Sequence, residues 1–147
     1  MAITQAIANA FKKQLLEADM DFASASPDKF KLSLYTSSAT LNSTTTAYTS
    51  TNEATTGGDY TTGGGVLTGT TTSISAGVAR VTFADLSFTG VTLTARGALI
   101  YNTSSALVTN AAVAVLDFGS DKTATAGTFT IQFPAATSTA AILRISG

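Results

Sequence analysis

The chain has 147 residues, of which only 12% are charged, with a formal net charge of −1 and no His, Cys or Trp. Without His and Cys it lacks the commonest general base, the commonest metal ligand and any thiolate, so we expect no enzyme activity, no cofactor and no bound metal. The nearly balanced charge also argues against nucleic-acid binding, because nucleic-acid binders usually carry a basic patch.

Hydroxyl side chains dominate the polar positions, with 28 Thr and 15 Ser. Thr is β-branched and favours pleated strands, so this bias predicts an all-β protein. A surface of hydroxyls with little charge also suits close packing of many copies, because long-range repulsion is small. No apolar run approaches the ~20 residues of a membrane-spanning helix. The N-terminus does not read as a secretion signal, so we expect synthesis in a bacterial cytoplasm.

The N-terminal segment has the pattern of an amphipathic helix. Ile3, Ile7, Phe11 and Leu15 recur at every fourth residue, which predicts a helix of roughly 12–16 residues within an N-terminal helix or arm at 1–20. The apolar stripe packs either on its own domain or on a partner subunit. These four residues are therefore candidate partner-binding residues.

A short linker and a strand follow. The linker from Asp19 to Asp28 contains Pro27, and its aspartates lack the spacing of a calcium loop. The stretch KFKLSLYT alternates apolar and polar residues, which predicts a half-buried strand at the start of a β domain spanning 28–147.

Residues 37–77 form a long Thr/Gly-rich excursion with few apolar residues. It holds either short strands, around Tyr48 and Val66, or an arm that another chain orders. Ordering backbone costs on the order of 1–2 kcal/mol per residue, which sparse anchors within one chain would hardly offset. Tyr48 and Tyr60 are therefore candidate partner-binding residues. Its glycine triplet has no following Lys-Ser or Lys-Thr, so it is not a phosphate-binding loop.

Short β-forming runs fill the rest of the chain, at 78–83, 86–88, 91–95, 97–102, 111–118, 127–133 and 140–146. Such spacing predicts an antiparallel β-sandwich of about eight strands, jelly-roll-like, with one N-terminal amphipathic helix. The runs 97–102 and 111–118 are apolar on both faces, which is typical of central strands. The expected core consists of Phe30, Leu32, Leu34, Val81, Phe83, Leu99, Val113, Val115, Phe129, Ile131 and Phe133.

The triplet Asp117-Phe118-Gly119 matches the magnesium-binding motif of protein kinases. The other kinase motifs are absent and the chain is too short for that fold. We expect instead that Asp117 ends a strand, that a polar turn follows, and that the chain returns as a strand at 128–133. Asp85 and Asp121 are likewise expected at strand ends or turns, where Asp accepts bonds from local backbone donors.

The chain resembles small structural proteins of tailed-bacteriophage virions over nearly its whole length. The resemblance rests on MAITQAIANAFKKQLLEA, on FKLSLYTSSATLNSTTTAYTSTNEATTGGDYTTGGGVL, on ARGALIYNTS and on AVAVLDFGSDKTATAGTFTIQFP. It implies a virion protein without catalytic residues, favouring a capsid decoration (cement) protein on the outside of the head. Such proteins commonly form trimers that clamp neighbouring major capsid subunits.

The expected partners are therefore the major capsid protein and further copies of this chain, as a closed homo-oligomer with the trimer as the expected state. The expected location is the capsid surface. A tail, neck or baseplate component is the alternative role within the virion. A carbohydrate-binding β-sandwich module is a third reading, from fold class alone.

Overall fold

The computed structural model describes residues 2–23, 28–137 and 139–146, so Pro27 of the predicted linker lies outside the described residues. The fold is mainly β, with antiparallel sheets and one short helix, which confirms the predicted class. No helix in the described ranges is long and apolar enough to cross a membrane. In chain order the elements are β1 (Ala6–Ile7), α1 (Asn9–Leu16), β2 (Phe30–Tyr35), β3 (Gly65–Val66), β4 (Thr71–Ser75), β5 (Val78–Thr82), β6 (Leu86–Asn102), β7 (Ala111–Ile131) and β8 (Leu143–Ile145).

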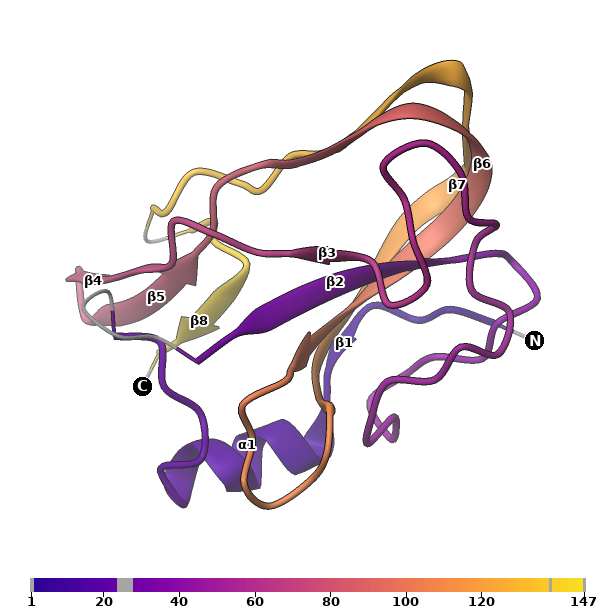
Figure 1. Cartoon of the computed structure of the whole chain (residues 1–147). Coiled ribbons are helices and arrows are strands. Elements are labelled where there is room, and N and C mark those ends of the chain that lie inside the picture. Colours follow the sequence, from indigo (N-terminus) through magenta and orange to yellow (C-terminus); the bar gives the residue numbers. More distant parts are fainter. Residues whose placement is uncertain (1, 24–27, 138, 147) are drawn as a thin grey trace.

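The larger sheet has the strand order β1-β7-β6-β2-β3. Its centre is the long hairpin of β6 and β7, which curves over the top of the molecule in Figure 1. The predicted runs 86–88, 91–95 and 97–102 are one strand, not three, with register shifts such as that between Phe88 and Val91. The glycine at position 90, between two of these runs, is absorbed as a bulge that bends the ribbon. The two runs predicted to be central do lie in central strands.

The predicted turn after Asp117 is wrong, because β7 continues through it to Ile131. Gly97 pairs with Asp117, and Ala95 pairs with Lys122. The residues 118–121 therefore lie opposite the single residue Arg96 and form a large bulge in an unbroken strand. Turn-forming residues such as Gly and Asp lengthen one strand here instead of reversing the chain.

The N-terminal helix is shorter than predicted and begins later. Ala6 and Ile7 form β1, which pairs with Val115 and Ala114 of β7, and Ile3 makes an isolated bridge to Leu41. Ile3 and Ile7 are thus extended, because Leu41 for Ile3 and the edge of β7 for Ile7 offer backbone partners that an isolated first turn would lack. Within the described residues 2–20, β1 belongs to the larger sheet and α1 packs on β7.

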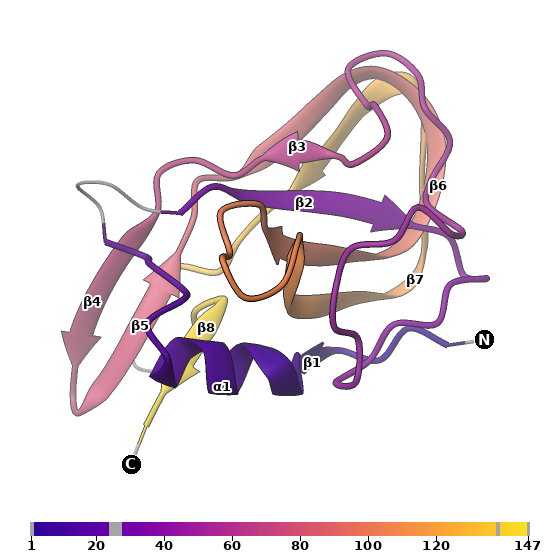
Figure 2. The same cartoon turned by 60° about the horizontal axis from the view of Figure 1, so that its bottom comes forward.

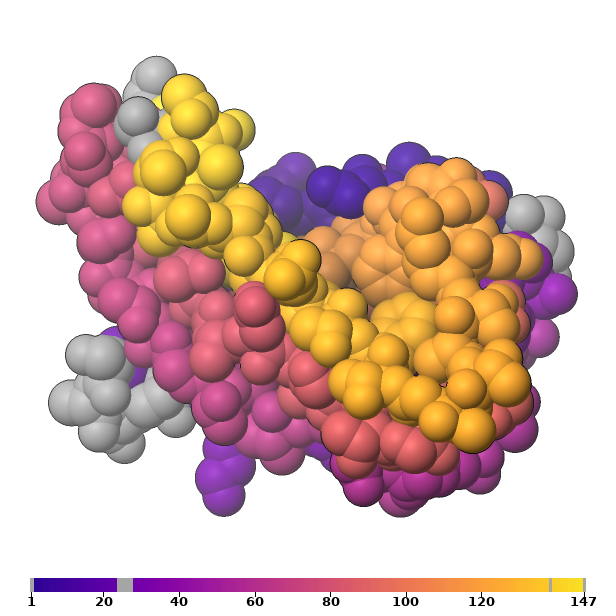
Figure 3. Space-filling view, turned by 90° about the horizontal axis from the view of Figure 1, so that it is seen from above, coloured from indigo at the N-terminus to yellow at the C-terminus, as the bar shows by residue number. Residues whose placement is uncertain are grey.

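The smaller sheet, with the order β4-β5-β8, stands beside the larger one, and α1 lies next to it in Figure 2. From above, the C-terminal segment crosses from β7 to the small sheet (Figure 3). Aromatic rings join these parts: Phe22 stacks on Phe30 at 4.6 Å, and both rings lie near Phe83. Of the predicted core residues, only Val81 and Phe133 are partly rather than fully buried.

Candidate partner-binding surfaces

The six residues predicted to contact partners do not form one surface. Ile3, Phe11 and Tyr60 are buried within their own chain, and Tyr60 is 0% exposed. The other three, Ile7, Leu15 and Tyr48, are partly buried and pack against the core. Tyr60 therefore serves the fold, because a side chain without exposed area cannot contact another protein until the domain opens.

The excursion docks on the free edge of β2 through residues between 52 and 66, whereas its last residues form β4 of the smaller sheet. Gly65 of β3 pairs with Leu32. Further along the same edge, the amide of Ala54 donates to the carbonyl of Leu34 at 2.8 Å, and the amide of Thr36 donates to the carbonyl of Asn52 at 3.0 Å. A strand at Val66 is thus confirmed, whereas the segment at Tyr48 forms no strand and has an isolated bridge between Ala47 and Ala111. The excursion is a cover for a sheet edge, not an arm.

All four tyrosines of the chain gather around Glu53, and we call them the tyrosine cluster. The hydroxyl of Tyr60 donates to Oε1 of Glu53 at 2.7 Å, and that of Tyr48 donates to Oε2 at 2.6 Å. The ring of Tyr101 stacks on Tyr48 with 4.8 Å between centroids. The hydroxyl of Tyr35 donates to a backbone carbonyl of the excursion at 2.6 Å. One carboxylate and four rings therefore hold the excursion on the sheet.

The tyrosine cluster predicts alkaline unfolding. Burial raises the pKa of Tyr35 and Tyr101 from 10.0 to about 12. Burial, with the hydrogen bond to the Glu53 carboxylate in addition, also raises the pKa of Tyr48 and Tyr60. Because these folded-state values lie above the unfolded value of 10.0, the contribution to stability is complete below pH 10 and is lost as the pH rises through about 12.

We therefore expect tyrosinate absorbance to appear in one cooperative step, together with loss of the β-sheet circular dichroism signal. The absorbance reports the tyrosines cleanly because the chain has no Trp. Independent titration of all four tyrosines near pH 10, with the circular dichroism spectrum unchanged, would contradict this prediction.

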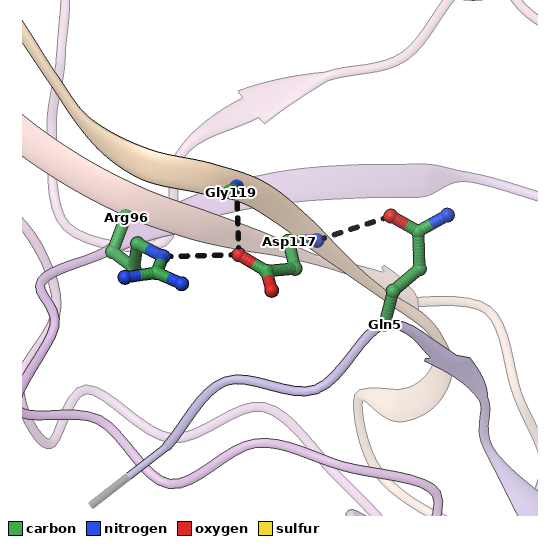
Figure 4. A network of polar contacts seen from close by, with 4 residues as sticks. All are labelled: Gln5, Arg96, Asp117 and Gly119. Atoms are coloured by element: carbon green, nitrogen blue, oxygen red, sulfur yellow. Dashed lines mark hydrogen bonds and ion pairs between the residues drawn. The ribbon is translucent and has the colours of Figure 1, made fainter.

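The kinase-like triplet has a structural role (Figure 4). Oδ1 of Asp117 accepts a bond from the backbone amide of Gly119 at 2.8 Å and from Nε of Arg96 at 3.0 Å. The Gly119 amide, followed by the Arg96 guanidinium, lowers the pKa of Asp117 below its usual value. The amide of Asp117 donates to Oε1 of Gln5 at 3.3 Å, and Gln5 immediately precedes β1. Asp117 thus closes the bulge of β7, and the described ranges contain no cluster of three or more potential metal-ligating residues.

Exposed hydroxyls line one face of the β6–β7 ribbon. This hydroxyl ladder consists of Ser87, Thr92, Thr94, Thr123 and Thr130, all exposed. Ser87 and Thr130 share a hydrogen bond of 2.8 Å across the strands, and so do Thr94 and Thr123. Thr92 accepts a bond from a backbone amide of β7 at 2.9 Å. The ladder lies on residues 86–95 of β6 and 123–131 of β7, and neither segment contains a charged residue.

An apolar groove lies between α1 and the small sheet, with a volume of about 460 Å³. Phe11 and Leu15 of α1 line it together with Phe22, and Ile74 and Ile145 line it from the small sheet. Ile74 is 74% exposed and Ile145 is 59% exposed. The groove and the hydroxyl ladder therefore both have the character of a protein contact.

Sequence reasoning missed the ladder and found only one side of the groove, since the candidate partner-binding residues Ile7, Phe11 and Leu15 line it. The number of threonines hints at the ladder, but only the pairing of β6 with β7 shows that five hydroxyls share one face. The groove combines residues separated by more than a hundred positions in the sequence, so no local pattern indicates it. No protein-family model, no curated protein and no solved structure matches this chain.

Proposed function

We propose that this protein is a structural protein of a tailed-phage virion that binds the outside of the capsid as a decoration protein. In this role it clamps neighbouring major capsid subunits. A protein that binds only the assembled lattice stabilises that lattice by mass action. The proposal is supported by the resemblance of the sequence to small virion proteins, and the observation that carries it is the hydroxyl ladder.

The hydroxyl ladder suits a contact with another protein for two reasons. The cores of protein interfaces are depleted in charged residues, and the ladder region has none. Each hydroxyl can donate one hydrogen bond and accept two, so the bonds within the ladder leave capacity for a partner. A partner's backbone and side-chain polar groups can therefore be satisfied without burying a charge.

The ladder is also held rigidly by the layer beneath it. On the opposite face of the same ribbon, Phe88, Leu93 and Phe129 are buried. Phe88 pairs directly with Phe129, and Leu93 pairs with Ala124. A surface fixed in this way loses little conformational entropy on binding, which favours recognition of a repeated lattice position.

Charge placed on the ladder should abolish head binding without unfolding the protein. We expect the double variant Ser87→Lys/Thr94→Lys to bind empty phage heads at least about tenfold more weakly, because burying an unpaired ammonium group is costly. Its melting temperature should stay close to that of the wild type, since both positions are exposed. Co-sedimentation with heads gives the affinity, and circular dichroism gives the melting temperature.

The matched control is Thr55→Lys/Thr62→Lys, which adds the same charge at exposed threonines of the excursion. We expect this control to bind heads like the wild type. Equal binding by the ladder variant and the wild type would refute the role of the ladder. Binding of the wild type to tails and not to heads would replace the proposed function by the tail, neck or baseplate role.

A further inference from the structure

We infer that the apolar groove binds a second copy of this chain, through Leu16 and Glu17 at the end of α1. Leu16 is 89% exposed. The described residues include five large hydrophobic side chains that are exposed. Leu16 is one of them, and Ile74 and Ile145 of the groove are two more. Three of these five therefore lie on or beside the groove, which is where a contact would remove the most apolar area from water.

The charges of the groove select an acidic occupant. The only charged residues among the described residues that line it are Arg80 and Arg144, which pair directly across β5 and β8. Arg80 is only 9% exposed, and its Nε is buried with no hydrogen-bond partner among the described residues. A carboxylate brought into the groove would bring a counter-charge to this guanidinium.

Glu17 can supply that carboxylate from the second copy. Within its own chain it forms an ion pair with Lys13 one turn earlier on the exposed side of α1. Exposed ion pairs contribute little to stability. Glu17 therefore loses little free energy when it leaves Lys13 and pairs with an arginine of the second copy. Leu16 and Glu17 thus present an apolar side chain next to a carboxylate, and the groove offers an apolar surface next to arginine side chains.

The contact is expected to be a two-fold pair. Leu16 follows Leu15, which itself lines the groove, so the inserting residue lies at the rim of the receiving surface, although the two side chains point to different sides of α1. A two-fold axis beside α1 allows each copy to place its Leu16 in the groove of the other at the same time. Such a dimer takes the place of the trimer expected from the sequence as the state in free solution. The inference concerns the isolated chain and does not rest on head binding.

Sedimentation velocity over a range of concentrations tests the inference on the full-length chain. The mass should rise with concentration toward twice the 14.9 kDa of one chain. Ile74→Asp should weaken this association at least about tenfold, because it places a charge in the apolar contact. The control Leu107→Asp makes the same change at a side chain that is 56% exposed and outside the groove, and it should associate like the wild type.

A mixing experiment identifies the inserted residue. Leu16→Asp alone and Ile74→Asp alone should each be monomeric, because both copies of the contact are damaged in either pure sample. In an equimolar mixture, the intact Leu16 of one variant meets the intact groove of the other, so one of the two contacts is restored and mixed dimers should form.

Monomers of the wild type at every concentration would overturn the inference. So would a mixture that associates no better than its components, or a groove that binds a small anionic amphiphile one-to-one in a protein that stays monomeric.

Discussion

Replacing Gly64 with Ala is expected to lower the free energy of unfolding by about 3 kcal/mol or more. Gly64 has a φ of +75°, and a Cβ there would overlap the carbonyl oxygen of Leu32 in β2. The backbone would have to move away from β2, although the neighbouring Gly65 pairs with Leu32 and the amide of Gly63 donates to Glu53. The substitution therefore detaches the excursion from the sheet edge as well as straining one residue. Urea unfolding followed by circular dichroism measures the loss.

Gly77→Ala is the matched control for this prediction. Its φ is also +75°, but a Cβ there would meet nothing within 4 Å. It should therefore lose only the ordinary cost of a left-handed residue, about 1 kcal/mol. Equal losses for the two variants would show that β3 does not approach β2 as closely as described.

Tyr60→Ala is expected to lower the free energy of unfolding by about 3–5 kcal/mol, because it leaves a cavity where a large, fully buried side chain stood. The ring packs edge-on against Phe88 at 4.9 Å between centroids. The hydroxyl accepts a bond from the amide of Leu34 at 2.8 Å and donates to Glu53. The variant is thus a test of stability, and any effect on partner binding would follow from unfolding.

Tyr60→Phe separates the hydroxyl from the ring. We expect a loss of about 1–3 kcal/mol, because the amide of Leu34 is left buried without its partner. Tyr48→Phe also removes a bond to Glu53, but Tyr48 is only partly buried and its hydroxyl accepts no backbone bond in the structure. Its loss should therefore be smaller. A larger loss for Tyr48→Phe than for Tyr60→Phe in urea unfolding would contradict the arrangement of the tyrosine cluster.

Where a local pattern decides the structure, the sequence was sufficient. The alternation of Phe30, Leu32 and Leu34 correctly predicted β2, and the run at 78–83 correctly predicted β5. The alternation gives the position of these strands but not their burial. The prediction that β2 is half-buried is wrong, because Ser33 and Tyr35 on its polar face are also 0% exposed. The buried core at Val113 and Val115 was likewise predictable from a run that is apolar on both faces.

The sequence was not sufficient to predict features of the fold that depend on contacts between distant residues. The turn residues after Asp117 are absorbed as a bulge because β6 continues to pair on both sides of them, which no local signal shows. Ile3 and Ile7 fit a helix or a strand equally well. The edge of β7 pairs with Ile7, and a bridge to Leu41 holds Ile3 extended. The excursion was expected to need another subunit because its link to the sheet depends on Glu53, whose partners Tyr48 and Tyr60 do not reveal their pairing in the sequence.

The most direct test of the proposed function is co-sedimentation of the purified wild-type chain with empty heads and, separately, with isolated tails of the same phage. The account predicts saturable binding to heads at a fixed number of copies per lattice repeat and no binding to tails. It predicts further that the bound protein raises the temperature at which the heads disrupt. Heads that remain bare at saturating protein, or that bind it without gaining heat resistance, would contradict a role as a clamp on the capsid surface.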